Sequence, residues 1–121
     1  MGEALRHHGT IAVVHADAGG RFTFWNDAAA AIFGYRADEV LGQRIDLVVP
    51  HEYRDMHWAG FNRTIGSNWR GADAWGEIEA LHKSGERLAL EVLLTPITGS
   101  DGRVLSVMGM FRRPHPEMLA S

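Results

Sequence analysis

The sequence predicts an α+β domain, in which a five-stranded antiparallel sheet carries several short helices on one face. Two segments rich in β-branched and aromatic residues open the chain, segments with helix-end signals follow, and three segments with alternating apolar residues close it. A chain of 121 residues has room for one hydrophobic core. We therefore expect one domain over residues 10–113, with a flank at 1–9 and a second flank or linker at 114–121.

The first two predicted strands form a hairpin. Residues 10–17 (TIAVVHAD) are rich in β-branched side chains, and residues 22–26 (FTFWN) place large side chains at alternate positions. The residues between them, 18–21 (AGGR), contain two glycines, which are typical of a turn. We expect the two strands to pair as neighbours.

Two short helices are predicted next. Residues 26–35 begin with Asn26, a favourable N-cap, and end at Gly34, which suits the left-handed position after a helix. Residues 37–45 repeat the pattern on a smaller scale, with acidic residues in the first turn and Gly42 after the last apolar residue. Both segments are short because their end signals lie close together.

A third helix is predicted over residues 50–66 (PHEYRDMHWAGFNRTIG). Pro50 and Glu52 are typical of a helix start, and Gly66 is typical of the position after a helix end. The next residues, 67–73, are polar and contain glycine, so we expect a loop there.

Three strands close the predicted sheet. Residues 74–83, 87–97 and 104–113 alternate apolar and polar side chains, and turn residues separate them. Residues 114–121 contain two prolines, which cannot continue a ladder of hydrogen bonds. The last three strands are therefore expected to form a meander that ends before this segment.

The composition excludes several classes of protein. Fifteen acidic and twelve basic side chains are interspersed, with a net charge of -3, so nucleic acid and anionic membranes are not expected as partners. No cysteine is available for a disulfide, a thiolate metal site or a nucleophile. The apolar runs are shorter than the ~20 residues of a membrane span, and the start lacks the apolar core of a signal peptide. With no phosphate loop and no nucleophile motif, we expect a cytoplasmic protein that is not an enzyme.

A histidine lies at the centre of the apolar face of the third predicted helix. At helical spacing, His57 shares this face with Tyr53, Met56, Gly60, Phe61 and Thr64. A buried imidazole needs partners for its nitrogens, because each unsatisfied polar group costs about 1–3 kcal/mol. The residues alone favour a hydrogen bond to a backbone carbonyl or to the adjoining loop, and they leave a metal ligand as the alternative.

The chain resembles PAS sensor domains over roughly residues 10–113. The segments FTFWNDAAAAIFGYRADEVLGQRIDLVVP and HKSGERLALEVLLTPI fall at PAS-like spacings. In haem-binding PAS domains of rhizobial oxygen-sensor kinases and direct-oxygen-sensor phosphodiesterases, the proximal histidine lies seven residues after a proline. His57 lies seven residues after Pro50. The resemblance therefore implies a gas sensor that binds haem b (iron protoporphyrin IX) with His57 as the iron ligand.

The resemblance also implies the lining of the cofactor pocket. We expect the following residues to form it: Tyr53, Met56, Gly60, Phe61, Ile65, Gly76, Ile78, Leu90, Val92, Leu94 and Gly109. At Gly60, close packing of the helix on the sheet is an equal alternative. Gly76 stands where the rhizobial kinases place an arginine that reaches bound oxygen, although a second way of counting places Glu77 there. Without that arginine, the pocket suits carbon monoxide and nitric oxide more than oxygen.

Three further residues are candidates for the side of the haem opposite His57. Trp75 and Trp69 carry indole donors, although a surface or interface position is the alternative for each. Met108 is a candidate sixth ligand, but strand alternation favours the outer face of the sheet for Met108 and Met110. On that face, adaptable methionines suit contact with a partner.

The expected function is detection of oxygen, carbon monoxide or nitric oxide and relay of this signal. The relay would use a homodimer formed through the outer sheet face or the flanks, and a downstream signalling domain or protein. One alternative is a cofactor-free PAS module for protein interaction and dimerisation. Another is a small-molecule or flavin sensor, and the absence of cysteine excludes the flavin type that forms a thiol adduct.

Overall fold

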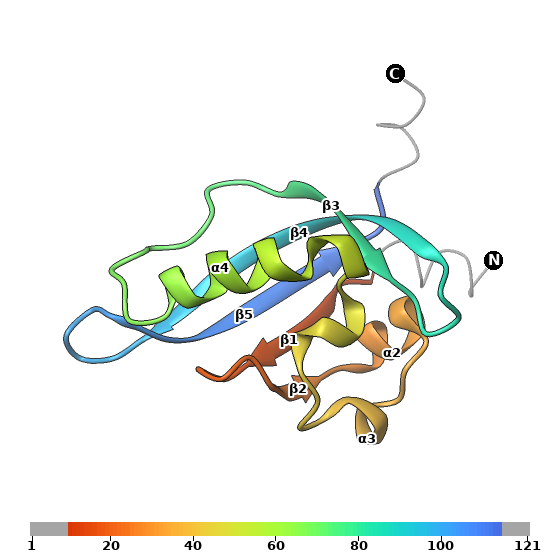
Figure 1. The fold of residues 1–121 in the computed structure, drawn as a ribbon, viewed down its shortest axis with the longest axis horizontal. Coiled ribbons are helices and arrows are strands. Elements are labelled where there is room, and N and C mark those ends of the chain that lie inside the picture. The colour runs from red at the N-terminus through yellow and green to blue at the C-terminus, as the bar shows by residue number, and fades with distance from the viewer. Residues whose placement is uncertain (1–9, 115–121) are drawn as a thin grey trace.

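A five-stranded antiparallel sheet in the order β2-β1-β5-β4-β3 forms the framework of the protein (Figure 1). The computed structural model describes residues 10–114. The strands are β1 (Ala12–Ala16), β2 (Phe22–Trp25), β3 (Gly76–Leu81), β4 (Arg87–Thr98) and β5 (Val104–Arg112). The sheet confirms the predicted α+β class.

The pairing of β1 with β5 joins a hairpin and a meander into one sheet. β1 and β2 form the predicted hairpin, and β3, β4 and β5 form the predicted meander. β1 lies beside β5, with Val14 opposite Gly109. The first and last strands of the chain are therefore neighbours, which brings the beginning and the end of the domain together.

The first helix, α2 (Asp27–Phe33), has the predicted ends. The Asn26 side chain accepts a hydrogen bond from the backbone N–H of Ala29 at 2.9 Å and from that of Val13 at 3.0 Å. Gly34 ends the helix with φ 83°. Asn26 thus satisfies a free helix donor and attaches the helix start to β1.

The next predicted helix is shorter than expected. α3 (Ala37–Val40) forms one turn, so the prediction of a helix over 37–45 is wrong beyond that turn. Gly42 adopts φ 88°, and its N–H donates to the carbonyl of Phe22 at 2.8 Å. The chain leaves the helix because this segment pairs with the start of β2, and it then forms the 3-10 helix η1 (Ile45–Val48).

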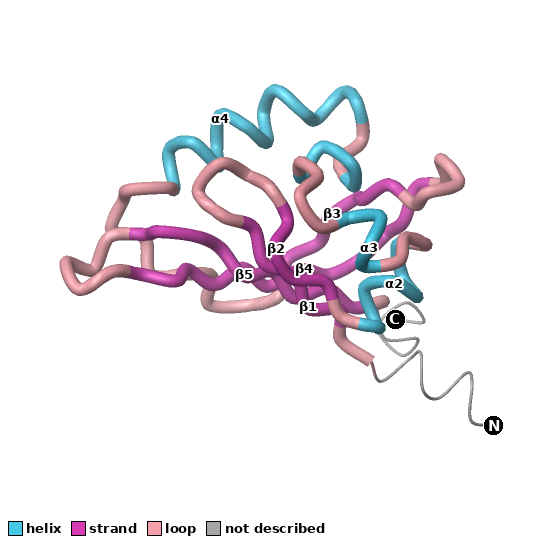
Figure 2. Tube along the Cα trace, turned by 90° about the horizontal axis from the view of Figure 1, so that it is seen from below, coloured by secondary structure: helices cyan, strands magenta, loops and turns pink. Residues whose placement is uncertain are grey.

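The predicted third helix consists of two parts. The 3-10 helix η2 (His51–Tyr53) leads into α4 (Arg54–Thr64), and Gly66 follows with φ 81°. α4 lies over one face of the sheet, and Figure 2 shows it standing off the strands on that side.

Aromatic side chains fill the core between α2 and the sheet. The ring centroid of Phe33 lies 5.2 Å from that of Trp25 and 5.3 Å from that of Phe111. Phe33 and Leu90 are almost fully buried. The dense part of the core therefore lies under α2, at one end of the sheet.

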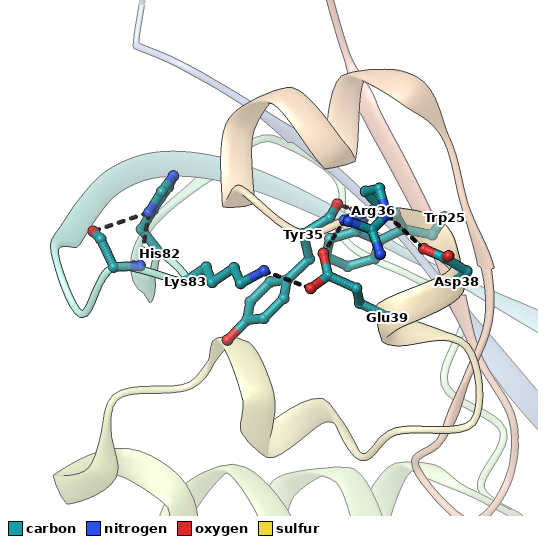
Figure 3. A network of polar contacts seen from close by, with 8 residues as sticks. Trp25, Tyr35, Arg36, Asp38, Glu39, His82 and Lys83 are labelled. Carbon is teal, nitrogen blue, oxygen red and sulfur yellow. Dashed lines mark hydrogen bonds and ion pairs between the residues drawn. The ribbon is translucent and has the colours of Figure 1, made fainter.

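Polar contacts attach the β3–β4 hairpin to the connection between α2 and α3 (Figure 3). Lys83 Nζ lies 2.5 Å from Glu39 Oε2, and the backbone N–H of Lys83 donates to the carbonyl of Phe33 at 2.9 Å. Trp25 Nε1 donates to the carbonyl of Tyr35 at 3.0 Å. These contacts hold the sheet and the helices together at the end of the sheet that is far from the C-terminal end of α4.

Candidate functional site

A cavity of about 820 Å³ lies between α4 and the sheet. This volume is within the usual range of about 300–1,000 Å³ for small-molecule and cofactor sites. α4, the loop after it and all five strands contribute to the lining, which is mainly apolar. The space therefore exists where α4 stands off the sheet.

His57 lines this cavity and has an unsatisfied nitrogen. The side chain is half-buried, and its Nδ1 is buried without a hydrogen-bond partner. The hydrogen bond to a backbone carbonyl that the residues alone favoured for His57 is therefore not formed by Nδ1. Burial lowers the pKa of His57, and the carboxylate of Asp46 opposes this shift. The imidazole is consequently neutral near pH 7, which is the form that ligates metals.

Aromatic neighbours hold the His57 ring. The Phe61 ring stacks on it with 6.1 Å between centroids, and the Trp58 ring meets it edge-on at 5.4 Å. Trp58 Nε1 donates to Asp46 Oδ1 at 2.5 Å. The guanidinium of Arg44 lies 4.4 Å from the Trp58 ring centroid. His57 is therefore positioned by contacts that reach from α4 to η1.

Sequence reasoning missed the role of Trp58. It places Trp58 outside the apolar face of α4, yet the ring packs against the turn between β1 and β2. A Cβ atom added at Gly20 would lie 2.2 Å from Trp58 Cη2, and Gly20 has φ 77°. The GG pair in the turn was a signal for this close approach.

Most of the predicted pocket residues come together around the cavity. The following residues line it with His57: Tyr53, Met56, Gly60, Phe61, Ile78, Val92, Leu94, Gly109 and Trp69. Met56 is 68% exposed and therefore belongs to the rim. A Cβ atom at Gly60 would have only Arg63 Nη2 within 4 Å, at 3.9 Å, so the helix backbone is accessible there.

Five predicted residues lie away from the cavity, which corrects the expectation for them. Leu90 is 1% exposed in the core, Ile65 lies beyond the end of α4, and Gly76 starts β3 beside open space. Trp75 and Met108 lie on the other face of the sheet. Strand alternation places Met108 there, and the contact with Arg112 places Trp75, as described next.

The outer face of the sheet carries Met108 and Trp75. Because Gly109 and Phe111 line the cavity, the alternating side chains of Met108 and Arg112 point the other way. The Arg112 guanidinium lies 3.9 Å from the Trp75 ring centroid, so Trp75 is held on that face. Neither residue reaches the cavity.

Arg63 and Ser67 line the cavity on the last turn of α4 and just after it, and the sequence did not predict either of them there. Thr64, which shares the predicted helix face with His57, also lines the cavity. Arg63 is exposed and reaches the cavity at its rim, since a charged side chain rarely faces a core. The helical spacing of three residues between Gly60 and Arg63 was the available signal.

Comparison with known proteins identifies the family. A family model described as the PAS fold matches residues 1–114. The chain belongs to the PAS family. PAS domains are signal-sensing modules, and they commonly dimerise and relay signals to partners. The predicted fold is therefore confirmed together with the coarse function.

A relative and several solved structures are similar to this PAS domain. An uncharacterised protein of Azorhizobium caulinodans is 30% identical over 97 residues, which cover 78% of this chain and 13% of that protein. A PAS domain structure from Colwellia psychrerythraea has a TM-score of 0.70 and 22% identity, with 93% of each chain covered. This PAS domain thus corresponds to a small part of its longer relative.

Two photoreceptor structures share the fold. An RNA-binding Light-Oxygen-Voltage receptor has a TM-score of 0.67 and 19% identity over 95% of this chain and 33% of its own. The light-state dimer of the fungal blue-light photoreceptor Vivid has a TM-score of 0.62 and 17% identity over 84% of this chain and 76% of its own. At these identities the likeness concerns the fold alone.

Two features are absent from the part of the chain that the structure describes. Between residues 10 and 114, no helix has the length and apolar character needed to cross a membrane. Over the same range, no group of three or more histidine, aspartate or glutamate side chains gathers as a metal site.

Proposed function

We propose that this PAS domain binds haem b through His57 and senses a diatomic gas. One observation carries the proposal: a neutral histidine, whose Nδ1 is buried without a hydrogen-bond partner, lines a mainly apolar cavity of about 820 Å³. Because Nδ1 is enclosed by protein atoms, the other ring nitrogen, Nε2, would ligate the iron.

The residues around the cavity fit a haem better than a metal ion alone. A porphyrin supplies four iron ligands itself, so one axial histidine from the chain is sufficient. Phe61 on the helix and Val92 and Leu94 on the sheet would enclose a flat apolar ring. Gly60 lets such a ring approach the helix backbone. These features support a planar apolar cofactor.

A cation at the rim fits the two carboxylates of haem b. Arg63 is exposed and lines the cavity six residues after His57. Its guanidinium could pair with a carboxylate at the opening while the ring lies inside. When bound, haem would supply an iron that takes a diatomic gas.

The contacts of α4 support a route for the signal. Trp58, next to His57, connects α4 to Asp46 in η1 and to Gly20 in the β1–β2 turn. A small displacement of His57 would disturb these contacts. A shift of a few kcal/mol in a two-state equilibrium is sufficient for a sensor.

An absorption spectrum tests the proposal directly. The protein would be produced with haem supplied, and the spectrum recorded in the reduced form with and without carbon monoxide. We expect a Soret band that His57→Ala abolishes or changes strongly. His51→Ala is the matched control, because His51 is exposed and does not line the cavity. A missing Soret band, or one that His57→Ala leaves unchanged, would rule the proposal out.

One observation suits the alternative, a cofactor-free interaction module, and equally suits the homodimer expected of the haem sensor. On the outer face of the sheet, Val13, Met110 and Leu93 lie opposite one another on three adjacent strands and are half-buried. Such a row suits contact with a second protomer. A colourless protein that forms dimers in sedimentation experiments would favour this alternative over the haem sensor.

A further inference from the structure

Trp69 is held beside the cavity by two attachments of its loop to the sheet. Its backbone N–H donates to Ser67 Oγ at 3.2 Å, and the carbonyl of Ser67 accepts from the N–H of Val104 at 2.8 Å. Three residues after Trp69, the N–H of Ala72 donates to the carbonyl of Leu94 at 3.1 Å. The half-buried Trp69 side chain lines the cavity between these two points.

Other neutral donors on the cavity lining already have partners. Thr64 Oγ1 donates to a backbone carbonyl of α4 at 2.9 Å, and Ser67 Oγ donates to another at 2.6 Å. Trp25 Nε1 donates to a carbonyl in the connection between α2 and α3 at 3.0 Å. Each of these groups has one proton to donate, so none of the three is free to serve a ligand.

The remaining polar side chains of the cavity lining cannot donate a hydrogen bond to a ligand held opposite His57. They either lie on the same side of the cavity as His57 or act as acceptors. Tyr53 and Arg63 come from the same helical segment as His57. Glu77 and Glu79 offer acceptors when ionised. The strands β4 and β5 contribute only Val92, Leu94, Val107, Gly109 and Phe111. A ligand held opposite His57 therefore meets apolar strands and the loop that carries Trp69.

We propose that Trp69 determines which diatomic gas the cavity favours, by donating its indole N–H to an oxygen molecule held opposite His57. This inference rests on the proposed function, because it requires haem on His57. Oxygen held there carries partial negative charge and gains from a hydrogen-bond donor, whereas carbon monoxide gains little. Trp69 thus takes the role of the arginine that Gly76 cannot supply.

Equilibrium binding of two gases to the haem-loaded protein tests this role. The ratio of oxygen affinity to carbon monoxide affinity is measured by absorption titration for the unchanged protein and for three variants. Trp69→Phe removes the donor and keeps an aromatic ring, whereas Trp69→Gln keeps an N–H donor. Trp75→Phe is the matched control, because it makes the same change on the other face of the sheet.

We expect Trp69→Phe to lower the affinity ratio about five- to tenfold, the usual effect of losing one hydrogen bond. Trp69→Gln should retain more of the ratio than Trp69→Phe, and Trp75→Phe should leave it unchanged. The C–O stretching frequency of the carbon monoxide complex should rise in Trp69→Phe and stay constant in Trp75→Phe.

The outcomes separate this inference from the proposed function. A His57-dependent Soret band with the same affinity ratio in Trp69→Phe as in the unchanged protein would overturn the role of Trp69 alone. A protein that binds carbon monoxide but no oxygen would also overturn it. A protein without a His57-dependent Soret band would overturn both proposals. If Trp69→Phe does not fold, a ratio in Trp69→Gln equal to that of the unchanged protein supports the role, and a ratio lowered tenfold contradicts it.

Discussion

The guanidinium of Arg112 lies 3.9 Å from the centre of the Trp75 ring, and its Nε donates to Glu91 Oε1 at 2.8 Å. These contacts lie on the face of the sheet opposite the cavity. Trp75 ends the loop that carries Trp69, and Arg112 is the last residue of β5. One arginine therefore connects the loop that carries Trp69 to the end of β5.

Replacing Arg112 should destabilise the domain. Glu91 is 7% exposed, and Arg112→Met would leave its carboxylate without this partner. Charged hydrogen bonds contribute about 1.5–3 kcal/mol, so we expect a loss of that size in the free energy of unfolding, measured with urea.

A double variant provides the control for this ion pair. Glu91→Gln removes the charge that Arg112→Met would leave unpaired. The two changes together should therefore cost less than the sum of the single changes. Simple additivity would show that the two side chains do not depend on each other.

Gly20 should not tolerate alanine. Its φ is 77°, and the added Cβ would lie 2.2 Å from Trp58 Cη2. Gly42 is the matched control, because it has φ 88° and nothing within 4 Å of an added Cβ. Both substitutions carry the backbone cost of about 1–2 kcal/mol. Gly20→Ala should cost about 1–3 kcal/mol more in urea unfolding, because the ring must move. Equal losses for the two variants would contradict the close packing of Trp58.

The contact between Arg87 and Glu52 should make stability depend on acid pH. The hydrogen bond from Arg87 lowers the pKa of Glu52 from 4.5 to about 2. Because the folded-state pKa is the lower one, this contribution is present above pH 4.5 and is lost as the pH falls towards 2. Glu52→Gln should therefore flatten the decrease in the urea midpoint between pH 4.5 and 2.

An exposed glutamate on the same hairpin as Arg87 serves as the control for Glu52. Glu86→Gln removes one carboxylate and leaves the contact between Glu52 and Arg87 in place. The acid limb of the stability profile should keep its slope in this variant. An unchanged slope in Glu52→Gln as well would show that the contact does not persist in solution.

Removing the His57 imidazole should stabilise the haem-free domain. Nδ1 is buried without a partner, and His57→Leu exchanges this polar group for an apolar one of similar size. The free energy of unfolding should rise by about 1–3 kcal/mol at pH 7, while haem binding is lost. His51→Leu, at an exposed position, should change neither property. A destabilised His57→Leu domain would indicate that His57 has a structural partner.

Local signals predicted most of the elements, and tertiary contacts decided where two of them end. Asn26 and Gly34 set the limits of α2 through hydrogen bonds to near neighbours and a left-handed φ. α3 stops early because the chain at Gly42 pairs with Phe22, twenty residues away. A contact of that kind has no signal in the spacing of neighbouring side chains.

The same distinction applies to the candidate site. The apolar face of α4 indicated that His57 points inward, and strand alternation indicated that Gly109 lines the pocket and Met108 does not. Local patterns succeed here because helical and strand periods fix which side chains share a face. The places of Trp69 and Trp75 could not be predicted in this way, since a loop has no such period.

Periodicity and end signals were sufficient to predict the α+β class, the PAS-like order of elements and the inward direction of His57. The folded structure was needed to show that His57 Nδ1 has no partner and that a cavity separates α4 from the sheet. It also placed Trp69 on the cavity and Trp75 on the opposite face, under Arg112. These features depend on packing between segments far apart in the chain, and packing is a property of the whole fold.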